Sequence, residues 1–408
     1  MLTPEYLQRI TEGAEEISSS LHRTIMDMII ERIMKRLGRG EDYLLTQTDR
    51  WQIQVLQESG ELLEDIQKEI ADKTKLQKKE IKDAFVDAGI NTLKWDDAVY
   101  IAAGLTPTAL MQSPTMLRIL ERDYLATAGE WNNFTRTTAL DAQRTFINQM
   151  DNAYHLVSTG AASYTQAVRD VINNITEVGL KVNYPTGYRM SIESATMMIV
   201  RTGVGQAAAD ISMKRMEEMN WDTVLVSAHL GARTGNGGMN PGNHLWWQGR
   251  FYSRSGKDKR FPDFVKTTGF GTGEGLCGWN CRHSFGSGDG VNNPYDDKKI
   301  NFADNHKVEE LQKKQRAQER RIRDTKRKIQ NLQTAVDNCK DDKARFELQN
   351  MLDRKAHTLK LQNKRYSTFC EENDLREYAE RLKVAQWDRK QAMKSAAAAR
   401  RYESAKKG

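Results

Sequence analysis

The sequence contains little of several things, and each shortage excludes a class of protein. Four cysteines in 408 residues are too few for a disulfide framework and are typical of a chain made in a reducing cytosol. No run of apolar residues approaches the roughly 18 that a membrane-spanning helix needs. The start of the chain lacks the basic segment and apolar core of a secretory signal peptide. We therefore expect neither export by that route nor a membrane anchor.

Familiar catalytic signatures are also missing. The chain has no G-x-x-x-x-G-K-[ST] phosphate-binding loop, no G-x-S-x-G nucleophile turn and no H-E-x-x-H zinc helix. The sequence therefore predicts no enzyme of a well-known class.

Glycine and proline are unevenly distributed along the chain. Residues 231–290 hold 15 of the 28 glycines, whereas Gly408 is the only glycine after Gly290 and no proline follows Pro294. These shifts, together with helical spacing of apolar residues elsewhere, predict an α+β protein. The predicted domains are a mostly helical N-terminal region (1–190), a small glycine-rich α/β module (191–300) and a long, charged, helical tail (301–408).

The tail is basic and the rest of the chain is mildly acidic. Residues 307–408 contain 28 Lys and Arg against 16 Asp and Glu, a net charge of +12, and the remainder has 34 against 39, a net of −5. This asymmetry predicts a polyanionic partner such as DNA, bound through phosphates and without base readout. The alternatives are that the charges only solvate a helix or that they meet an acidic protein surface.

Apolar residues in the tail recur at three-four spacing, as at Ile322, Ile329 and Val336, and Phe346 extends the pattern. This spacing predicts a coiled-coil seam. We expect such a tail to extend from the body and to require a partner helix.

The glycine-rich module holds the densest group of metal-ligating side chains. Cys277, Cys281 and His283 lie within seven residues, and His229 and His244 precede them. Thiolate and imidazole are zinc ligands, so the first three, completed by His229 or His244, predict a structural zinc site. Two alternatives also fit: cysteines buried as small apolar side chains beside hydrogen-bonded histidines, and a Cys277–Cys281 disulfide. We expect the five residues to lie close together.

A metal-assisted hydrolase or nuclease is the alternative function. The three histidines, with Asp263 or Glu274, could act as general acid and base, and Cys281 could act as a nucleophile. The spacing assigns no nucleophile, base and orienting group, so the residues favour a structural role.

Several short motifs follow one another between Ile199 and Gly290. In order they are Arg201-Thr202, Ser227-Ala228-His229-Leu230-Gly231-Ala232-Arg233, His244, Trp247-Gln248-Gly249-Arg250-Phe251-Tyr252, Thr268-Gly269-Phe270-Gly271 and Gly275-Leu276-Cys277-Gly278-Trp279-Asn280-Cys281-Arg282-His283. This stretch resembles the minor capsid protein 2 branch of the phage minor capsid protein family. The order of its motifs is also similar to a MuF-type head-morphogenesis domain. The resemblance assigns a structural role to Arg201, His229, His244, Gln248, Gly249, Asn280 and Arg282.

The resemblance implies a virion protein that is present in few copies near the portal and takes part in head assembly. Its partners would then be the portal and other capsid proteins, and its basic tail would suit packaged DNA. No established enzyme activity is implied. Assembly in the host cytoplasm fits the absence of an export signal.

Overall fold

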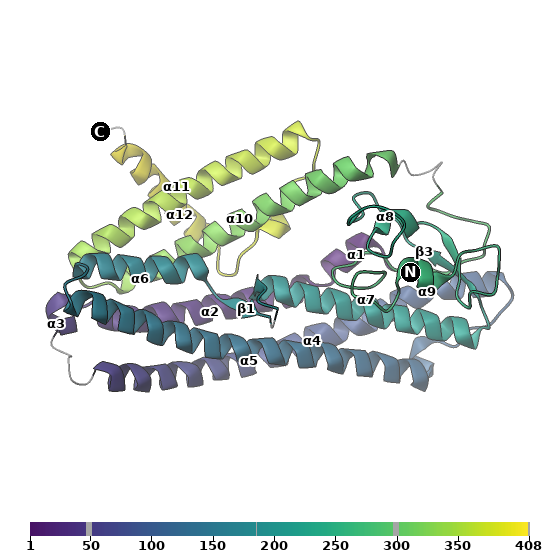
Figure 1. Ribbon diagram of the computed structural model, residues 1–408, viewed down its shortest axis with the longest axis horizontal. Helices are drawn as coiled ribbons and strands as arrows, with labels where there is room; N and C mark the ends of the chain where they lie inside the picture. The colour runs from purple at the N-terminus through teal and green to yellow at the C-terminus, as the bar shows by residue number, and fades with distance from the viewer. Residues whose placement is uncertain (46–50, 185, 297–301, 407–408) are drawn as a thin grey trace. The chain divides into compact units, whose positions relative to one another are not determined.

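The computed structural model describes residues 1–45, 51–184, 186–296 and 302–406 (Figure 1). These residues are mostly helical with a few short antiparallel strands, which confirms the predicted α+β class and the long helical C-terminal region. Single 3₁₀ turns lie at Leu110–Gln112, Phe302–Asp304 and Ala379–Leu382. The helices are α1 (Pro4–Arg9), α2 (Glu12–Leu37), α3 (Glu41–Leu45), α4 (Trp51–Ala102), α5 (Pro114–Ser158), α6 (Tyr164–Val178), α7 (Ile192–Glu218), α8 (His244–Trp247), α9 (Phe264–Thr268), α10 (Asn305–Asn338), α11 (Asp342–Glu372) and α12 (Arg389–Ala405). The strands are β1 (Lys181–Asn183), β2 (Arg189–Ser191), β3 (Thr223–Val226), β4 (Phe251–Ser253) and β5 (Phe285–Ser287).

The chain divides into two compact units, each assembled from three separate segments. Unit 1 contains Met1–Glu15, Lys75–Asn132 and Ser194–Lys313, and unit 2 contains Glu16–Thr74, Asn133–Glu193 and Lys314–Gly408. Each change from one unit to the other falls inside a helix, namely α2, α4, α5, α7 or α10. The domain boundaries near residues 190 and 300 come from composition and stay a prediction.

Unit 1 has a helical core. Segments of α1, α4, α5 and α7 bury apolar side chains against one another, since each helix presents an apolar face to its neighbours. Arg201 on α7 connects this core to α1, because its Nε donates to the carbonyl of Leu7 (3.2 Å) and its Nη2 donates to Oε1 of Gln8 (3.3 Å). The core residues include Leu7, Ile81, Phe85, Ala88, Leu120, Val200, Val204 and Ile211.

Unit 1 also contains a three-stranded antiparallel sheet in the order β4-β3-β5. The central strand β3 is a run of mostly β-branched residues, Thr223-Val224-Leu225-Val226, a composition that is typical of strands. Val224, Leu225 and Val226 are all buried, so both faces of β3 are covered. Aromatic side chains complete this second core, in which the members include Met216, Trp247, Tyr252, Phe264, Phe285, Cys277 and Cys281.

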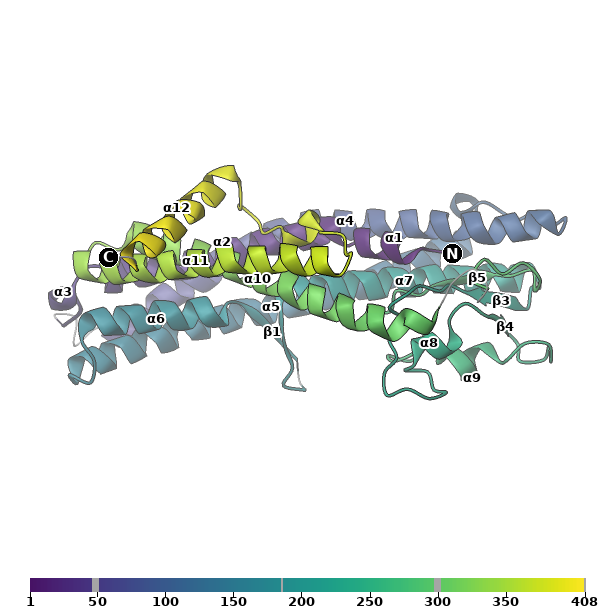
Figure 2. The same cartoon turned by 90° about the horizontal axis from the view of Figure 1, so that it is seen from above.

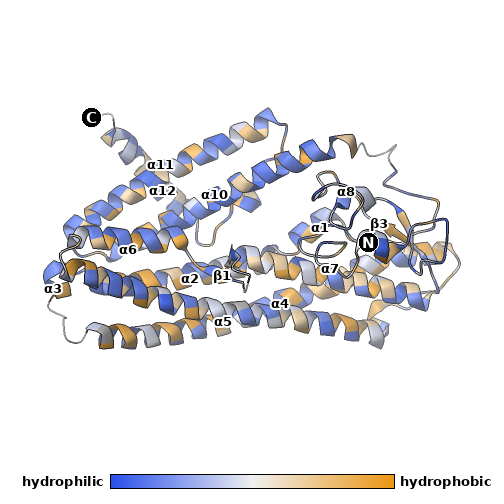
Figure 3. Cartoon of the chain, viewed as in Figure 1, coloured by the Kyte–Doolittle hydropathy of each residue, from blue (hydrophilic) through white to orange (hydrophobic). Residues whose placement is uncertain are grey.

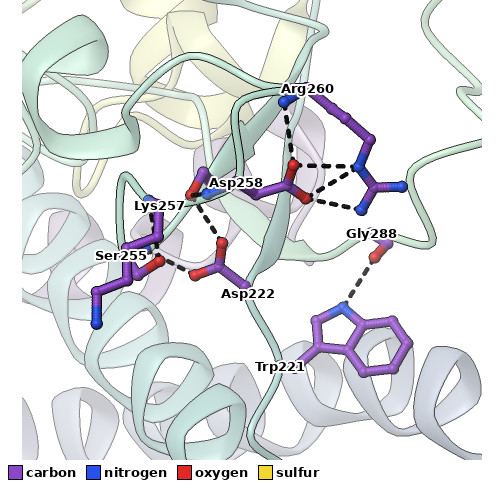
Figure 4. Close-up of polar contacts among 8 residues, drawn as sticks. Trp221, Asp222, Ser255, Lys257, Asp258, Arg260 and Gly288 are labelled. Atoms are coloured by element: carbon purple, nitrogen blue, oxygen red, sulfur yellow. Dashed lines mark hydrogen bonds and ion pairs between the residues drawn. The ribbon is translucent and has the colours of Figure 1, made fainter.

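The loop after β4 is fixed by Asp222, which immediately precedes β3 (Figure 4). Its carboxylate accepts hydrogen bonds from Oγ of Ser253 (2.7 Å) and from the backbone N–H of Ser255 (2.7 Å). Burial alone would raise the pKa of Asp222, but these bonds hold it below its ordinary value. In the same loop, Arg260 donates to Asp258 (2.7 Å). These contacts keep the exposed loop in a defined conformation beside the sheet.

Unit 2 includes the greater part of the charged C-terminal region. Helix α11 packs against α6 and against α12, and Figure 2 shows α11 and α12 together from above. Lys328 on α10 and Lys355 on α11 both bind Glu177 on α6, at 2.7 and 2.5 Å. Figure 3 shows that α10 to α12 are largely hydrophilic, as expected from their composition. Among the described residues, no helix combines the length and apolar character that crossing a bilayer requires.

The expectation that the tail extends from the body is wrong. Ile322, Ile329 and Leu332 are fully buried, and Arg23 on α2 donates to Oγ1 of Thr334 on α10 (2.9 Å). The seam therefore lies inside unit 2, where other segments of the chain cover it. Phe346, which the same spacing placed in the seam, is 64% exposed. A true coiled coil stays a prediction.

Candidate functional site

Two loops of unit 1 carry the site residues that the sequence identified. The first joins β3 to β4 and includes α8, and the second joins α9 to β5. In the second loop a Cβ on Gly275 would lie 2.2 Å from the carbonyl oxygen of Gly269, and one on Gly278 would lie 2.4 Å from that of Gly273. Glycine is required at both positions because backbone passes so closely over backbone. This close packing determines where Cys281 and His283 lie.

Three more motif residues shape these loops, two through their backbone conformation and one through hydrogen bonds. Asn280 has a positive φ of 54° and an exposed side chain, so its role is to make a left-handed turn before Cys281. Gly249 has a φ of 67° where the chain enters β4. Arg282 donates to the carbonyl of Gly231 (3.5 Å) and to Oε1 of Gln312 (3.4 Å), which joins the second loop to the first and to α10.

His244, Cys281 and His283 meet at the centre of the site. Nδ1 of His244 lies 3.3 Å from Nδ1 of His283, and Sγ of Cys281 lies 3.8 and 3.7 Å from these two atoms. The three residues are 2%, 7% and 2% exposed. Among the residues that the structure describes, they form the group of ligand-type side chains close enough together to hold one metal ion.

The outer edge of each imidazole faces a hydrogen-bonding partner. Nε2 of His283 lies 2.8 Å from Oε1 of Gln248, and the same oxygen accepts the backbone N–H of His229 (3.1 Å). Nε2 of His244 lies 2.9 Å from the carbonyl of Glu274 and 2.7 Å from Nη2 of Arg233. These contacts fix both ring orientations.

Burial controls the protonation of the cluster. It lowers the pKa of His244 to about 4, and nearby Arg233 contributes to this shift. Burial also lowers the pKa of His283 well below its ordinary value, as do the neighbouring histidines and arginines. The pKa of the Cys281 thiol is raised by burial. At neutral pH the ring pair is therefore uncharged, which is the form of histidine that binds metals.

The other two residues predicted as ligands lie beside this group. Sγ of Cys277 contacts the carbonyl of His283 (3.8 Å), and the ring of His229 stacks on that of His283 with centroids 4.4 Å apart. Of the two histidines that the sequence offered as the fourth ligand, His244 belongs to the group and His229 lies outside it, as does Cys277. Both cysteines are free thiols, so the disulfide alternative is not formed in this structure.

The proposed acid–base partners have other contacts. Asp263 caps α9 by accepting the backbone N–H of Lys266 (2.8 Å), and Glu274 presents its carbonyl oxygen to His244. Sequence reasoning missed Arg233 and Trp247 as site residues. The Trp247 ring lies 4.5 Å from that of His244 and 4.9 Å from that of His283, measured between centroids. The signal for both was their position within the quoted motifs.

The geometry defines a buried, hydrogen-bonded cluster that joins two loops of a mainly helical protein. The sequence matches the family model described as phage minor capsid protein 2 over residues 2–391, nearly the whole chain. The chain belongs to the phage minor capsid protein 2 family. It is therefore a structural protein of the phage capsid, with other virion proteins as its partners. Neither curated proteins nor solved structures gave a match. The similarity to a MuF-type domain stays a prediction.

Proposed function

We propose that this capsid protein takes part in head assembly near the portal, in few copies, and that its basic C-terminal region contacts packaged DNA. The observation that supports the DNA contact is the net charge of +12 over residues 307–408, against −5 for the rest. Assembly in the host cytoplasm, beside the portal and other capsid proteins, belongs to the same proposal and rests on the family resemblance.

Only part of the basic charge is free to meet DNA. Lys328 and Lys355 pair with Glu177, and Arg401 forms two hydrogen bonds with Asp353 (2.9 and 2.7 Å). Exposed basic side chains remain on α12, where they include Arg389, Lys390, Lys394 and Arg400. This set supports phosphate contact by the surface of α12.

Replacing Arg389, Lys390 and Lys394 together by alanine is expected to weaken binding to duplex DNA of any sequence. If each contacts one phosphate, the log–log slope of affinity against salt should fall by about 2.7, because each contact contributes roughly 0.9. The measurement is a fluorescence titration of the full chain with unrelated duplexes at several salt concentrations.

The matched control replaces Lys75, Lys78 and Lys79 on α4, which are exposed and carry the same charge. It should leave the slope nearly unchanged. If the control lowers the salt slope as much as the α12 variant does, the DNA contact does not lie on α12. Absence of wild-type binding at low salt would contradict the DNA contact and leave an acidic protein surface as the partner.

In the intact virion, the protein should occupy a single vertex. A reconstruction of the head by electron cryomicroscopy without imposed symmetry would show its density beside the portal and few copies per particle. Density repeated over the capsid faces would contradict the proposed location.

We also propose that the protein is not an enzyme. His244, Cys281 and His283 are at most 7% exposed, so a polymeric substrate cannot reach them in this conformation. This burial favours a structural cluster over the hydrolase or nuclease alternative.

A further inference from the structure

We propose that His244, Cys281 and His283 bind one zinc ion, through the Nδ1 atoms of both imidazoles and the thiolate of Cys281. The ion would connect the loop that holds α8 to the loop that enters β5. This inference is independent of the DNA contact and of the location near the portal.

The spacing of the three ligand atoms supports a tetrahedral ion. Zinc binds imidazole nitrogen at about 2.0–2.1 Å and thiolate sulfur at about 2.3 Å. In a tetrahedron these bond lengths separate two nitrogens by about 3.3–3.4 Å and a nitrogen from the sulfur by about 3.6 Å. The distances between the three atoms here are 3.3, 3.7 and 3.8 Å. The side chains therefore already occupy three corners of such a site.

The tautomer of His283 is fixed by its surroundings. A backbone N–H can only donate, so the Gln248 atom that meets the N–H of His229 must be the amide oxygen. That oxygen also faces Nε2 of His283 at 2.8 Å, so Nε2 carries the proton. Nδ1 of the neutral ring then carries a lone pair that points to His244 and Cys281. Metal-bound histidines commonly donate their other ring N–H to a hydrogen-bond acceptor, as Nε2 of His283 donates to Gln248 here.

The two ring nitrogens of His244 can find hydrogen-bonding or metal partners in either of two tautomers. Without metal, Arg233 donates to Nε2 of His244 (2.7 Å), and Nδ1–H donates to His283. With metal, Nε2–H donates to the carbonyl of Glu274 (2.9 Å), and Arg233, which also donates to that carbonyl (2.9 Å), must move away from its 2.7 Å contact with the protonated Nε2. Zinc binding would then release the thiol proton of Cys281 and move the His244 proton from Nδ1 to Nε2.

The proposed ligand set excludes Cys277 and His229. The thiol of Cys277 contacts the His283 carbonyl, and the ring of His229 lies parallel to that of His283 within 23°. Neither belongs to the group whose ligand atoms all lie within 4.8 Å of one another among the described residues.

The test begins with metal analysis of the full-length protein, purified without chelators from zinc-supplied cells. We expect about one zinc ion per chain, as one tetrahedral site requires. Cys281→Ala and His283→Ala should lose the zinc, whereas Cys277→Ala and His229→Ala should retain it. A chelator should lower the melting temperature of the wild type and leave that of Cys281→Ala unchanged.

A cobalt spectrum keeps the test informative if the ligand variants fail to fold. Wild-type protein loaded with Co²⁺ should show the visible bands of a tetrahedral ion and a charge-transfer band of one thiolate. Wild-type protein that contains no zinc and gives no such spectrum would overturn the site in favour of a hydrogen-bonded cluster. Loss of zinc in Cys277→Ala would overturn the three-residue ligand set.

Discussion

Replacing Arg327 by methionine is expected to destabilise the protein by about 3–5 kcal/mol, because it leaves a buried carboxylate without its main partner. Glu193, in the first turn of α7, is 2% exposed. Its Oε1 accepts from Nη2 of Arg327 on α10 (2.9 Å) and lies 3.0 Å from Nδ1 of His22 on α2. Urea-induced unfolding followed by circular dichroism would measure the loss.

Two further variants separate the buried charge from the loss of an arginine. Arg321→Met removes an exposed arginine from the same helix and should change stability by less than about 0.5 kcal/mol. Adding Glu193→Gln to Arg327→Met should recover part of the lost stability, because the double variant no longer buries an unpaired carboxylate. Equal losses from Arg321→Met and Arg327→Met would rule out the buried pair as the cause.

The same cluster predicts how stability depends on pH. Burial alone would raise the pKa of Glu193, but Arg327 and His22 together lower it well below its ordinary range. A carboxyl group of this kind stabilises the fold fully above its unfolded pKa of about 4.3, and the contribution is lost as the pH falls through the folded value. The difference in the free energy of unfolding between wild type and Glu193→Gln should therefore become smaller as the pH falls below about 4.

Gly203→Ala is expected to destabilise the protein by about 1–3 kcal/mol through overpacking. A Cβ at this position of α7 would lie 2.1 Å from Oγ1 of Thr127 and 3.2 Å from Cζ of Phe85. Both side chains are buried, at 5% and 1% exposure, so neither can easily move away. The measurement is the shift in the midpoint of urea unfolding.

Gly205→Ala, two residues further along α7, provides the matched control. A Cβ there would have no neighbour within 4 Å, so the substitution should only improve helix propensity and stabilise the protein by about 0.5–1 kcal/mol. Opposite signs for the two variants would support the packing described for α7. Stabilisation by both would show that Thr127 lies elsewhere.

Local pattern was sufficient to predict several features. The β-branched run at 223–226 is typical of a strand and forms β3, and the grouping of cysteines, histidines and glycines indicated where ligand-type side chains meet. Which of these side chains meet was less predictable, because it depends on loop geometry. Cys277 has a positive φ of 59°, and its thiol contacts a carbonyl, whereas His244 reaches the cluster from another loop.

Contacts between distant segments could not be predicted at all. Glu193 meets His22 from 171 residues away, and no spacing in the sequence connects either residue to Arg327. For the same reason, helical periodicity identified Ile322 and Ile329 as buried but not the segments that cover them. It also placed Phe346 in the seam, although this side chain is exposed. Only tertiary packing determines which turns of a helix are buried.

The assembly of each unit from three distant segments constrains how the chain folds during synthesis. Unit 2 needs segments beginning at Glu16, Asn133 and Lys314, so the ribosome must translate about three quarters of the chain before the last of them starts to emerge. At a translation rate of roughly 5–20 residues per second, apolar faces such as that of α2 remain without their partner segments for many seconds. Non-local contacts of this kind slow folding. A chain that stops short of α10 lacks the last segment of unit 2 and the end of the last segment of unit 1, so a prematurely terminated product completes neither unit.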